Sequence, residues 1–91
     1  MPNHISNSAR ISKLADIEES VRGSKLIVGD NTVIDSFVKI KFAGGSGDIV
    51  LGESCYLNSG TVLYCGNGIK IGNKVLIAAN CTLAPVNHGI L

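Results

Sequence analysis

Aliphatic residues recur at every sixth position of this chain, in four groups of three. In the last group Ile71, Ile77 and Leu83 are six residues apart, which fits neither the 3.6-residue period of a helix nor the two-residue period of a lone strand. A coil with three short flat sides points one such residue inward from each side. The twelve positions are Ile5, Ile11, Ile17, Val28, Ile34, Ile40, Leu51, Leu57, Leu63, Ile71, Ile77 and Leu83. The spacing therefore predicts an all-β fold, a parallel β-helix of about four coils.

Polar segments separate the four groups. The groups begin at residues 5, 28, 51 and 71, so successive starts are 23, 23 and 20 residues apart, whereas three six-residue steps alone would give 18. The surplus falls in segments rich in Gly, Ser and Asn, a composition typical of turns and loops. We therefore expect loops outside the coils at 22–25 and 43–48, and a turn at 65–68.

The position four residues after each aliphatic is predicted to be a corner with a small side chain. It is Ala, Val, Thr, Gly or Cys everywhere except at Asn67 and Asn87. Gly29, Gly52 and Gly72 directly follow the first aliphatic of three groups, where glycine allows a tight turn. We expect residues 1–91 to form one β-helix domain, with the coils over 11–91. The polar surroundings of Ile5 leave 1–10 open as an irregular segment, and 13–22 could also form a short helix.

Composition excludes several classes of function. The net charge is +1, charged residues make up 16%, and the Lys and Arg residues are scattered, which argues against nucleic acid and anionic membranes as partners. No apolar run reaches the roughly 20 residues of a membrane span, and the first ten residues lack the apolar core of a signal peptide. We expect a cytoplasmic protein. Three cysteines without a CxxC argue against a disulfide framework or a zinc knuckle. Cys55 and Cys81 are expected in the core, and Cys65 in an exposed turn.

The coils and the Asn87-His88 pair that follows them resemble the hexapeptide-repeat acyltransferases, a family with a single-stranded left-handed parallel β-helix. The similarity covers roughly residues 11–91 and is greatest to bacterial O-acetyltransferases of sugars and surface polysaccharides, through the IGNKVLI coil at 71–77. The resemblance implies acetyl-coenzyme A as the acyl donor and a sugar or polysaccharide hydroxyl as the acceptor. It also implies a trimer with active sites between neighbours, and we expect outward Ala and Val side chains near the trimer axis.

His88 is the candidate catalytic residue. Attack of a hydroxyl on a thioester requires removal of the hydroxyl proton, and an imidazole that titrates near neutral pH suits that task. The resemblance implies this role for His88; the alternative is a histidine in a surface loop. Asn87 either orients the acceptor or the imidazole, or is a turn residue. Asn58 is a candidate acceptor-binding residue, with a polar corner residue as its alternative.

Other sites are not expected. Where the galactoside-specific branch of the family has a second Asn and then an acidic residue, this chain has Gly60 and Tyr64, which argues against a galactoside acceptor. The zinc-binding branch needs three histidines and this chain has two, so no metal site is predicted. The glycine-rich stretch at 43–47 lacks the GK[ST] ending of a phosphate-binding loop.

The resemblance also bears on the size of the site. Members of the family continue past the histidine with further coils that line the coenzyme A groove, whereas this sequence ends three residues after His88. We therefore expect weak or no acetyl transfer by these 91 residues alone. The alternative class of function is a non-catalytic β-helix scaffold that retains only the fold and an oligomer surface.

Overall fold

The computed structural model describes residues 3–85, which form a β-solenoid of twelve short strands without a helix. The strands make three parallel four-stranded sheets. Sheet A contains β1 (His4–Ile5), β4 (Leu26–Val28), β7 (Ile49–Leu51) and β10 (Ile69–Ile71). Sheet B contains β2 (Arg10–Ile11), β5 (Val33–Ile34), β8 (Tyr56–Leu57) and β11 (Leu76–Ile77). Sheet C contains β3 (Asp16–Ile17), β6 (Lys39–Lys41), β9 (Val62–Tyr64) and β12 (Thr82–Leu83).

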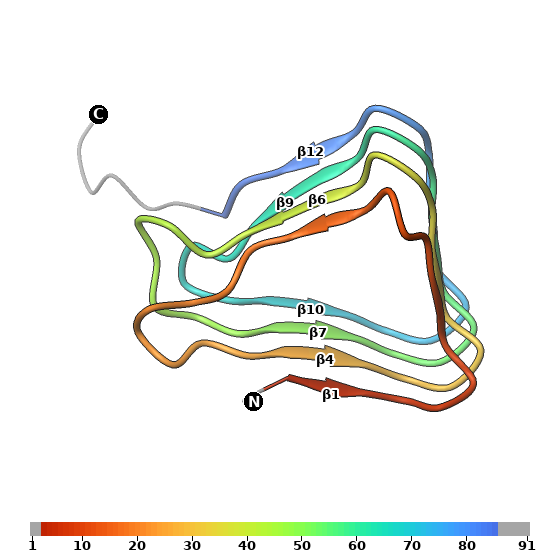
Figure 1. The fold of residues 1–91 in the computed structure, drawn as a ribbon, viewed down its shortest axis with the longest axis horizontal. Helices are drawn as coiled ribbons and strands as arrows, with labels where there is room; N and C mark the ends of the chain where they lie inside the picture. The colour runs from red at the N-terminus through yellow and green to blue at the C-terminus, as the bar shows by residue number, and fades with distance from the viewer. Residues whose placement is uncertain (1–2, 86–91) are drawn as a thin grey trace.

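The predicted fold class is confirmed, with a small difference in the number of turns. The chain passes through sheets A, B and C in order, and we call each passage a coil, from coil 1 (β1 to β3) to coil 4 (β10 to β12). It returns to sheet A three times, so it completes about three turns and then adds part of another. Figure 1 shows sheets A and C as two sides of a triangle.

The six-residue pattern sets the register of the sheets. All twelve predicted positions lie in strands, and each is paired with its counterpart in a neighbouring coil, as Ile34 is with Leu57. Sheet A stacks Ile5, Val28, Leu51 and Ile71 in the same way. Because successive strand residues point to opposite faces, one aliphatic ladder from each sheet fills the interior.

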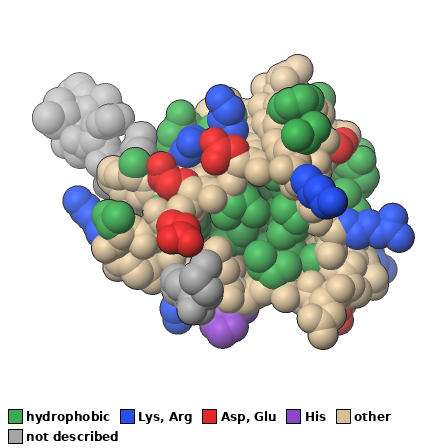
Figure 2. All heavy atoms as spheres, in the orientation of Figure 1, with side chains coloured by type: hydrophobic (Ala, Val, Ile, Leu, Met, Phe, Trp, Pro, Cys, Tyr) green, Lys and Arg blue, Asp and Glu red, His purple; other side chains and the backbone are tan. Residues whose placement is uncertain are grey.

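Burial is greatest in the middle coils. Ile34, Ile40, Leu57 and Leu63 are fully buried, whereas Ile77 and Leu83 of coil 4 are only half-buried, and Ile5 of coil 1 is 41% exposed. In Figure 2 hydrophobic side chains gather in the centre of one end of the solenoid, framed by charged ones. An end coil lacks a neighbour on one side, so its inward side chains stay partly open to water.

The six-residue spacing alone missed part of the core. Leu26 and Ile49 are fully buried although they lie two residues before the predicted inward positions Val28 and Leu51. These strands are three residues long, so their first and third side chains both point inward. Phe42, next to β6, is also buried.

The corner rule holds at two of the three corners of each coil. We name the corners by the sheets they join: A–B (6–9, 29–32, 52–55 and 72–75), B–C (12–15, 35–38, 58–61 and 78–81) and C–A (18–25, 42–48 and 65–68). Thr32 and Cys55 at the A–B corner and Val38 and Thr61 at the B–C corner are buried. At the C–A corner the rule does not apply, because Val21, Gly44 and Asn67 are exposed on longer loops.

Buried polar side chains at the corners bond to the next coil. Thr32 Oγ1 donates to the carbonyl oxygen of Gly52 at 2.6 Å, and Thr61 Oγ1 donates to that of Ala78 at 2.9 Å. Cys55 Sγ lies 2.9 Å from the carbonyl oxygen of Gly72. Hydrogen bonding makes these hydroxyls compatible with the interior.

The C–A loops correct two further predictions. Residues 13–22 form no helix; they contain β3 and part of the loop 18–25. Cys65 is fully buried rather than exposed, because its loop stacks on the loop of the preceding coil and its Sγ lies 3.5 Å from the carbonyl oxygen of Phe42. The coil also begins before residue 11, since His4 and Ile5 pair with Ile27 and Val28. Within the described range there is no helix long and apolar enough to cross a membrane.

Candidate functional site

The predicted catalytic segment lies beyond the residues that the structure describes. His88 and Asn87 both fall outside the range 3–85. The last described residue, Pro85, follows β12 at the C–A corner, where its carbonyl oxygen accepts a hydrogen bond from Asn67 N at 3.3 Å. The chain therefore enters the His88 segment from this corner, next to the loop of coil 3.

Asn58, the third predicted site residue, lies at the B–C corner directly after β8. It is half-buried, and its Nδ2 donates to the carbonyl oxygen of Ile77 at 2.9 Å. Its side chain therefore links coil 3 to coil 4. Within residues 3–85 its Oδ1 accepts no hydrogen bond, so this atom can still accept one from a bound hydroxyl. The structural role and the predicted acceptor-binding role use different atoms of the same amide.

Asn58 and Pro85 lie at opposite ends of sheet C. Asn58 belongs to the corner that leads into sheet C, whereas Pro85 lies past the far end of β12. Strand β9 connects these two corners within coil 3. Asn58 therefore lies at the B–C corner, whereas residues 87 and 88 follow Pro85, which lies at the C–A corner.

Asp35 lies next to Asn58 on the preceding coil. Because Ile34 pairs with Leu57, the residues that follow them, Asp35 and Asn58, hold equivalent positions about 4.8 Å apart along the solenoid. One Asp35 carboxylate oxygen accepts a hydrogen bond from Ser36 N at 2.7 Å, and the other accepts one from the Tyr56 hydroxyl at 3.2 Å. Within residues 3–85 no Lys or Arg pairs with this carboxylate.

The Asp35 carboxylate changes the acidity of Tyr56. The hydrogen bond from the phenol and the negative charge of Asp35 both favour the protonated phenol, and they raise the pKa of Tyr56 above its ordinary value of 10.0. Tyr56 is therefore a hydrogen-bond donor at neutral pH. The pair presents one phenol and one carboxylate on the outside of coils 2 and 3.

Two large apolar side chains extend this surface. Phe37 at the B–C corner is 61% exposed and Leu14, at the equivalent position of coil 1, is 60% exposed. The backbone joins them, because Phe37 N donates to the carbonyl oxygen of Leu14 at 3.1 Å. We call Leu14, Asp35, Phe37 and Tyr56 the aromatic corner.

The sequence prediction overlooked the aromatic corner as a site. The chain has four aromatic residues, and only Phe42 is buried; Phe37, Tyr56 and Tyr64 are exposed. None of these three occupies an inward position of the six-residue pattern, so the pattern itself directs them outward. That signal indicates the outward direction of the three rings, but not which residues lie beside them.

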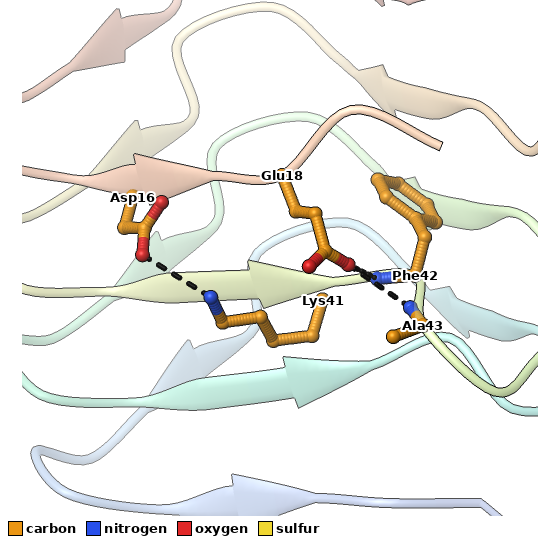
Figure 3. Close-up of polar contacts among 5 residues, drawn as sticks. All are labelled: Asp16, Glu18, Lys41, Phe42 and Ala43. Carbon is orange, nitrogen blue, oxygen red and sulfur yellow. Dashed lines mark hydrogen bonds and ion pairs between the residues drawn. The ribbon is translucent and has the colours of Figure 1, made fainter. Parts of the chain in front are cut away.

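A hollow of about 300 Å³ lies between the loops 18–22 and 42–44. Figure 3 shows its polar contacts: Glu18 Oε1 accepts hydrogen bonds from Phe42 N at 2.7 Å and from Ala43 N at 2.9 Å. Beside it, Lys41 Nζ lies 3.2 Å from Asp16 Oδ2. These contacts hold one loop on the next, so they account for the Glu18 carboxylate without a ligand.

The outward faces of the sheets carry apolar side chains as well. Ile27 and Val50 pair with one another on the outside of sheet A, between His4 and Lys70. Both are half-buried. Of this pair, Val50 is of a residue type expected on the outward flank, and Ile27 is not; whether the flank packs on a neighbour stays a prediction.

The described residues hold no cluster of potential metal ligands. In the range 3–85 no three His, Cys, Asp or Glu side chains come together as a metal-binding group would. Cys55 and Cys65 are buried against backbone carbonyl groups, and Cys81 is half-buried.

Comparison with protein families, with curated proteins and with solved structures finds no match for this chain. The resemblance to hexapeptide-repeat acyltransferases therefore depends on the sequence motifs and agrees with the solenoid fold.

Proposed function

We propose that this chain carries the catalytic base and part of the acceptor site of an acetyl-coenzyme A-dependent O-acetyltransferase, whose acceptor is a hydroxyl of a sugar or surface polysaccharide. One observation carries the proposal: a hexapeptide solenoid in regular register is followed by Asn87-His88, with His88 only five residues after the last inward aliphatic, Leu83. The alternative, a scaffold without catalysis, requires no histidine at that place.

The proposed chemistry is a single acyl transfer. His88 takes the proton of the acceptor hydroxyl while the hydroxyl oxygen attacks the thioester carbonyl. The tetrahedral intermediate then collapses to an acetyl ester, and the sulfur of coenzyme A leaves with the proton returned by His88. Asn58, at the other end of sheet C from Pro85, supplies its unused Oδ1 to a hydroxyl on another part of the acceptor, and Asn87 orients the imidazole or the acceptor.

A trimer is part of this proposal. The outward, half-buried pair Ile27 and Val50 supports a flank that packs on a neighbouring subunit, because aliphatic side chains on the outer face of a sheet gain stability when an oligomer buries them fully. Sedimentation velocity at micromolar concentration measures the assembly directly. A trimer is expected, and a stable monomer would contradict it.

The test of the catalytic proposal measures coenzyme A release by chromatography with several sugar acceptors. It compares the 91-residue chain with the same chain extended by the downstream coils of a hexapeptide-repeat acetyltransferase. Each is prepared as His88→Ala and as the matched control His4→Ala. We expect greater release from the extended chain, a loss of about 10² to 10⁴-fold with His88→Ala, and little change with His4→Ala.

Two results would contradict the proposal. If His88→Ala and His4→Ala released coenzyme A at equal rates, His88 would not be the base. If neither the chain nor its extension released coenzyme A with any acceptor, the scaffold alternative would hold instead.

A further inference from the structure

Phe37 has an unfavourable backbone conformation for its residue type. Its φ is 64°, in the left-handed region, where a bulky side chain is uncommon and strained. The equivalent position is Gly60 in coil 3 and Asn80 in coil 4, residue types that adopt this conformation more readily. Coil 2 thus has the least suitable residue of the three at this position.

The Phe37 side chain contributes little buried apolar surface to the fold. It is 61% exposed, although a buried aromatic ring would be among the largest contributors to a core of this size. Strained conformations of this kind concentrate at functional sites, and exposed apolar patches mark places of interaction. The backbone conformation and the exposure of Phe37 together favour a partner outside the chain that contacts its ring.

The polar groups at the same corner as Phe37 restrict the chemical class of that partner. Asp35 precedes Phe37 by two residues, and its carboxylate accepts a hydrogen bond from the Tyr56 hydroxyl. Asn58 is the neighbour of Asp35 on the next coil, with its Oδ1 unoccupied by described residues. Hydrogen-bond acceptors therefore share the B–C corner with an exposed aromatic ring and Leu14, and this combination suits a molecule with an apolar face and hydroxyl donors at its edge.

We propose that the aromatic corner is a glycan subsite, in which a pyranose ring lies on Phe37 and donates hydroxyl hydrogens to Asp35. This inference depends on the proposed function, because it extends the binding of a sugar acceptor along the B–C corner. A second copy of the chain suits the surface less well, because a two-fold contact centred here would bring two Asp35 carboxylates together without a described cation to separate them.

The subsite is tested by binding alone, without acetyl-coenzyme A. Cellohexaose, maltohexaose and mannohexaose are titrated separately into the ¹⁵N-labelled chain. We expect at least one of them to shift the backbone amide signals of 35–38 and 56–60. The substitution Phe37→Asn introduces the residue type that coil 4 has at the equivalent position, Asn80. This variant should bind the oligosaccharide about tenfold more weakly. Tyr64→Phe, on another face of the solenoid, should leave the affinity unchanged.

A stability measurement separates binding from a structural role. If Phe37 serves a ligand, Phe37→Asn relieves strain and should raise the urea midpoint of unfolding. A lower midpoint would overturn the proposal, and so would the absence of shifts with all three oligosaccharides, or shifts caused by a penta-arginine peptide in their place. His88→Ala should retain binding, so a failure of the catalytic proposal is distinguishable from a failure of this one.

Discussion

Ile34 and Leu57 occupy paired positions in β5 and β8, and both side chains are fully buried. Each is the inward residue of its strand, so the contact between coils 2 and 3 repeats the spacing of the sequence. This stacking is the main source of stability in a solenoid, because each coil contacts only its neighbours.

Removing one member of the ladder should therefore be costly. We expect Leu57→Ala to lower the free energy of unfolding by about 2 to 5 kcal/mol through lost burial and the cavity left behind. Leu76→Ala is the matched control, since Leu76 points outward and is 70% exposed; its effect should stay within about 0.5 kcal/mol. Urea unfolding measures both. Equal losses in the two variants would contradict the assignment of inward and outward faces.

The glycines after the first aliphatic of coils 2 to 4 should differ in their tolerance of substitution. A Cβ on Gly29 would lie 2.6 Å from the carbonyl carbon and oxygen of Gly52, whereas one on Gly72 would have no atom within 4 Å. We expect Gly29→Ala to destabilise the chain by about 1 to 3 kcal/mol through overpacking, and Gly72→Ala to be tolerated. Thermal unfolding of the two variants checks this. A destabilisation by Gly72→Ala as large as that by Gly29→Ala would indicate a turn requirement rather than close stacking of coils.

Glu18 should stabilise the loop at 42–48. Glu18→Ala removes a carboxylate that accepts hydrogen bonds from Phe42 N and Ala43 N, so we expect a loss of about 1 to 3 kcal/mol. Amide exchange at these two positions should become faster. Glu19→Ala, on the same loop and exposed, is the control and should change neither quantity. Unchanged exchange at Phe42 and Ala43 in Glu18→Ala would exclude the contact.

The ionisation of Tyr56 should report its contact with Asp35. In Tyr64→Phe, where Tyr56 is the remaining tyrosine, an absorbance titration should give a pKa above 10.0. Adding Asp35→Asn should lower this pKa, because the repulsion of the phenolate is removed. An unchanged pKa would show that the two side chains do not interact in solution.

The same contact predicts a direction for stability. The folded state holds the Tyr56 proton more tightly than the unfolded chain does, so the contribution is present in full below pH 10.0. It is lost as the pH rises through the raised pKa of the folded state. Over this alkaline range the free energy of unfolding should therefore fall more in Tyr64→Phe than in Tyr64→Phe combined with Asp35→Asn. Equal losses in the two proteins would contradict the linkage.

The repeat made the interior predictable, and the departures have physical causes. Ile34 and Leu57 follow from a six-residue interval, since an in-register parallel stack repeats the same side chain in each coil. Leu26 and Ile49 did not follow from it, because a third strand residue adds a second inward position. Cys65 was misassigned because turn composition does not reveal that two loops stack on one another.

The candidate site was predictable only in part. The place of Asn58 after an inward leucine indicates a corner, but its hydrogen bond to Ile77 belongs to the next coil and cannot be read from local sequence. Asp35 and Tyr56 come together because residues about 20 apart lie on adjacent coils. A residue's outward direction follows from the period, whereas its neighbours depend on loop lengths between coils.

The central claim is tested most directly by identifying the product of acetyl transfer. Coenzyme A release alone does not distinguish transfer from hydrolysis of the thioester, so the glycan itself is analysed by mass spectrometry after incubation with acetyl-coenzyme A and the extended chain. The account predicts an O-acetylated glycan with the unmodified sequence and with His4→Ala, and almost none with His88→Ala. An acetylated glycan formed equally well by His88→Ala, or free acetate as the sole product of all three proteins, would contradict it.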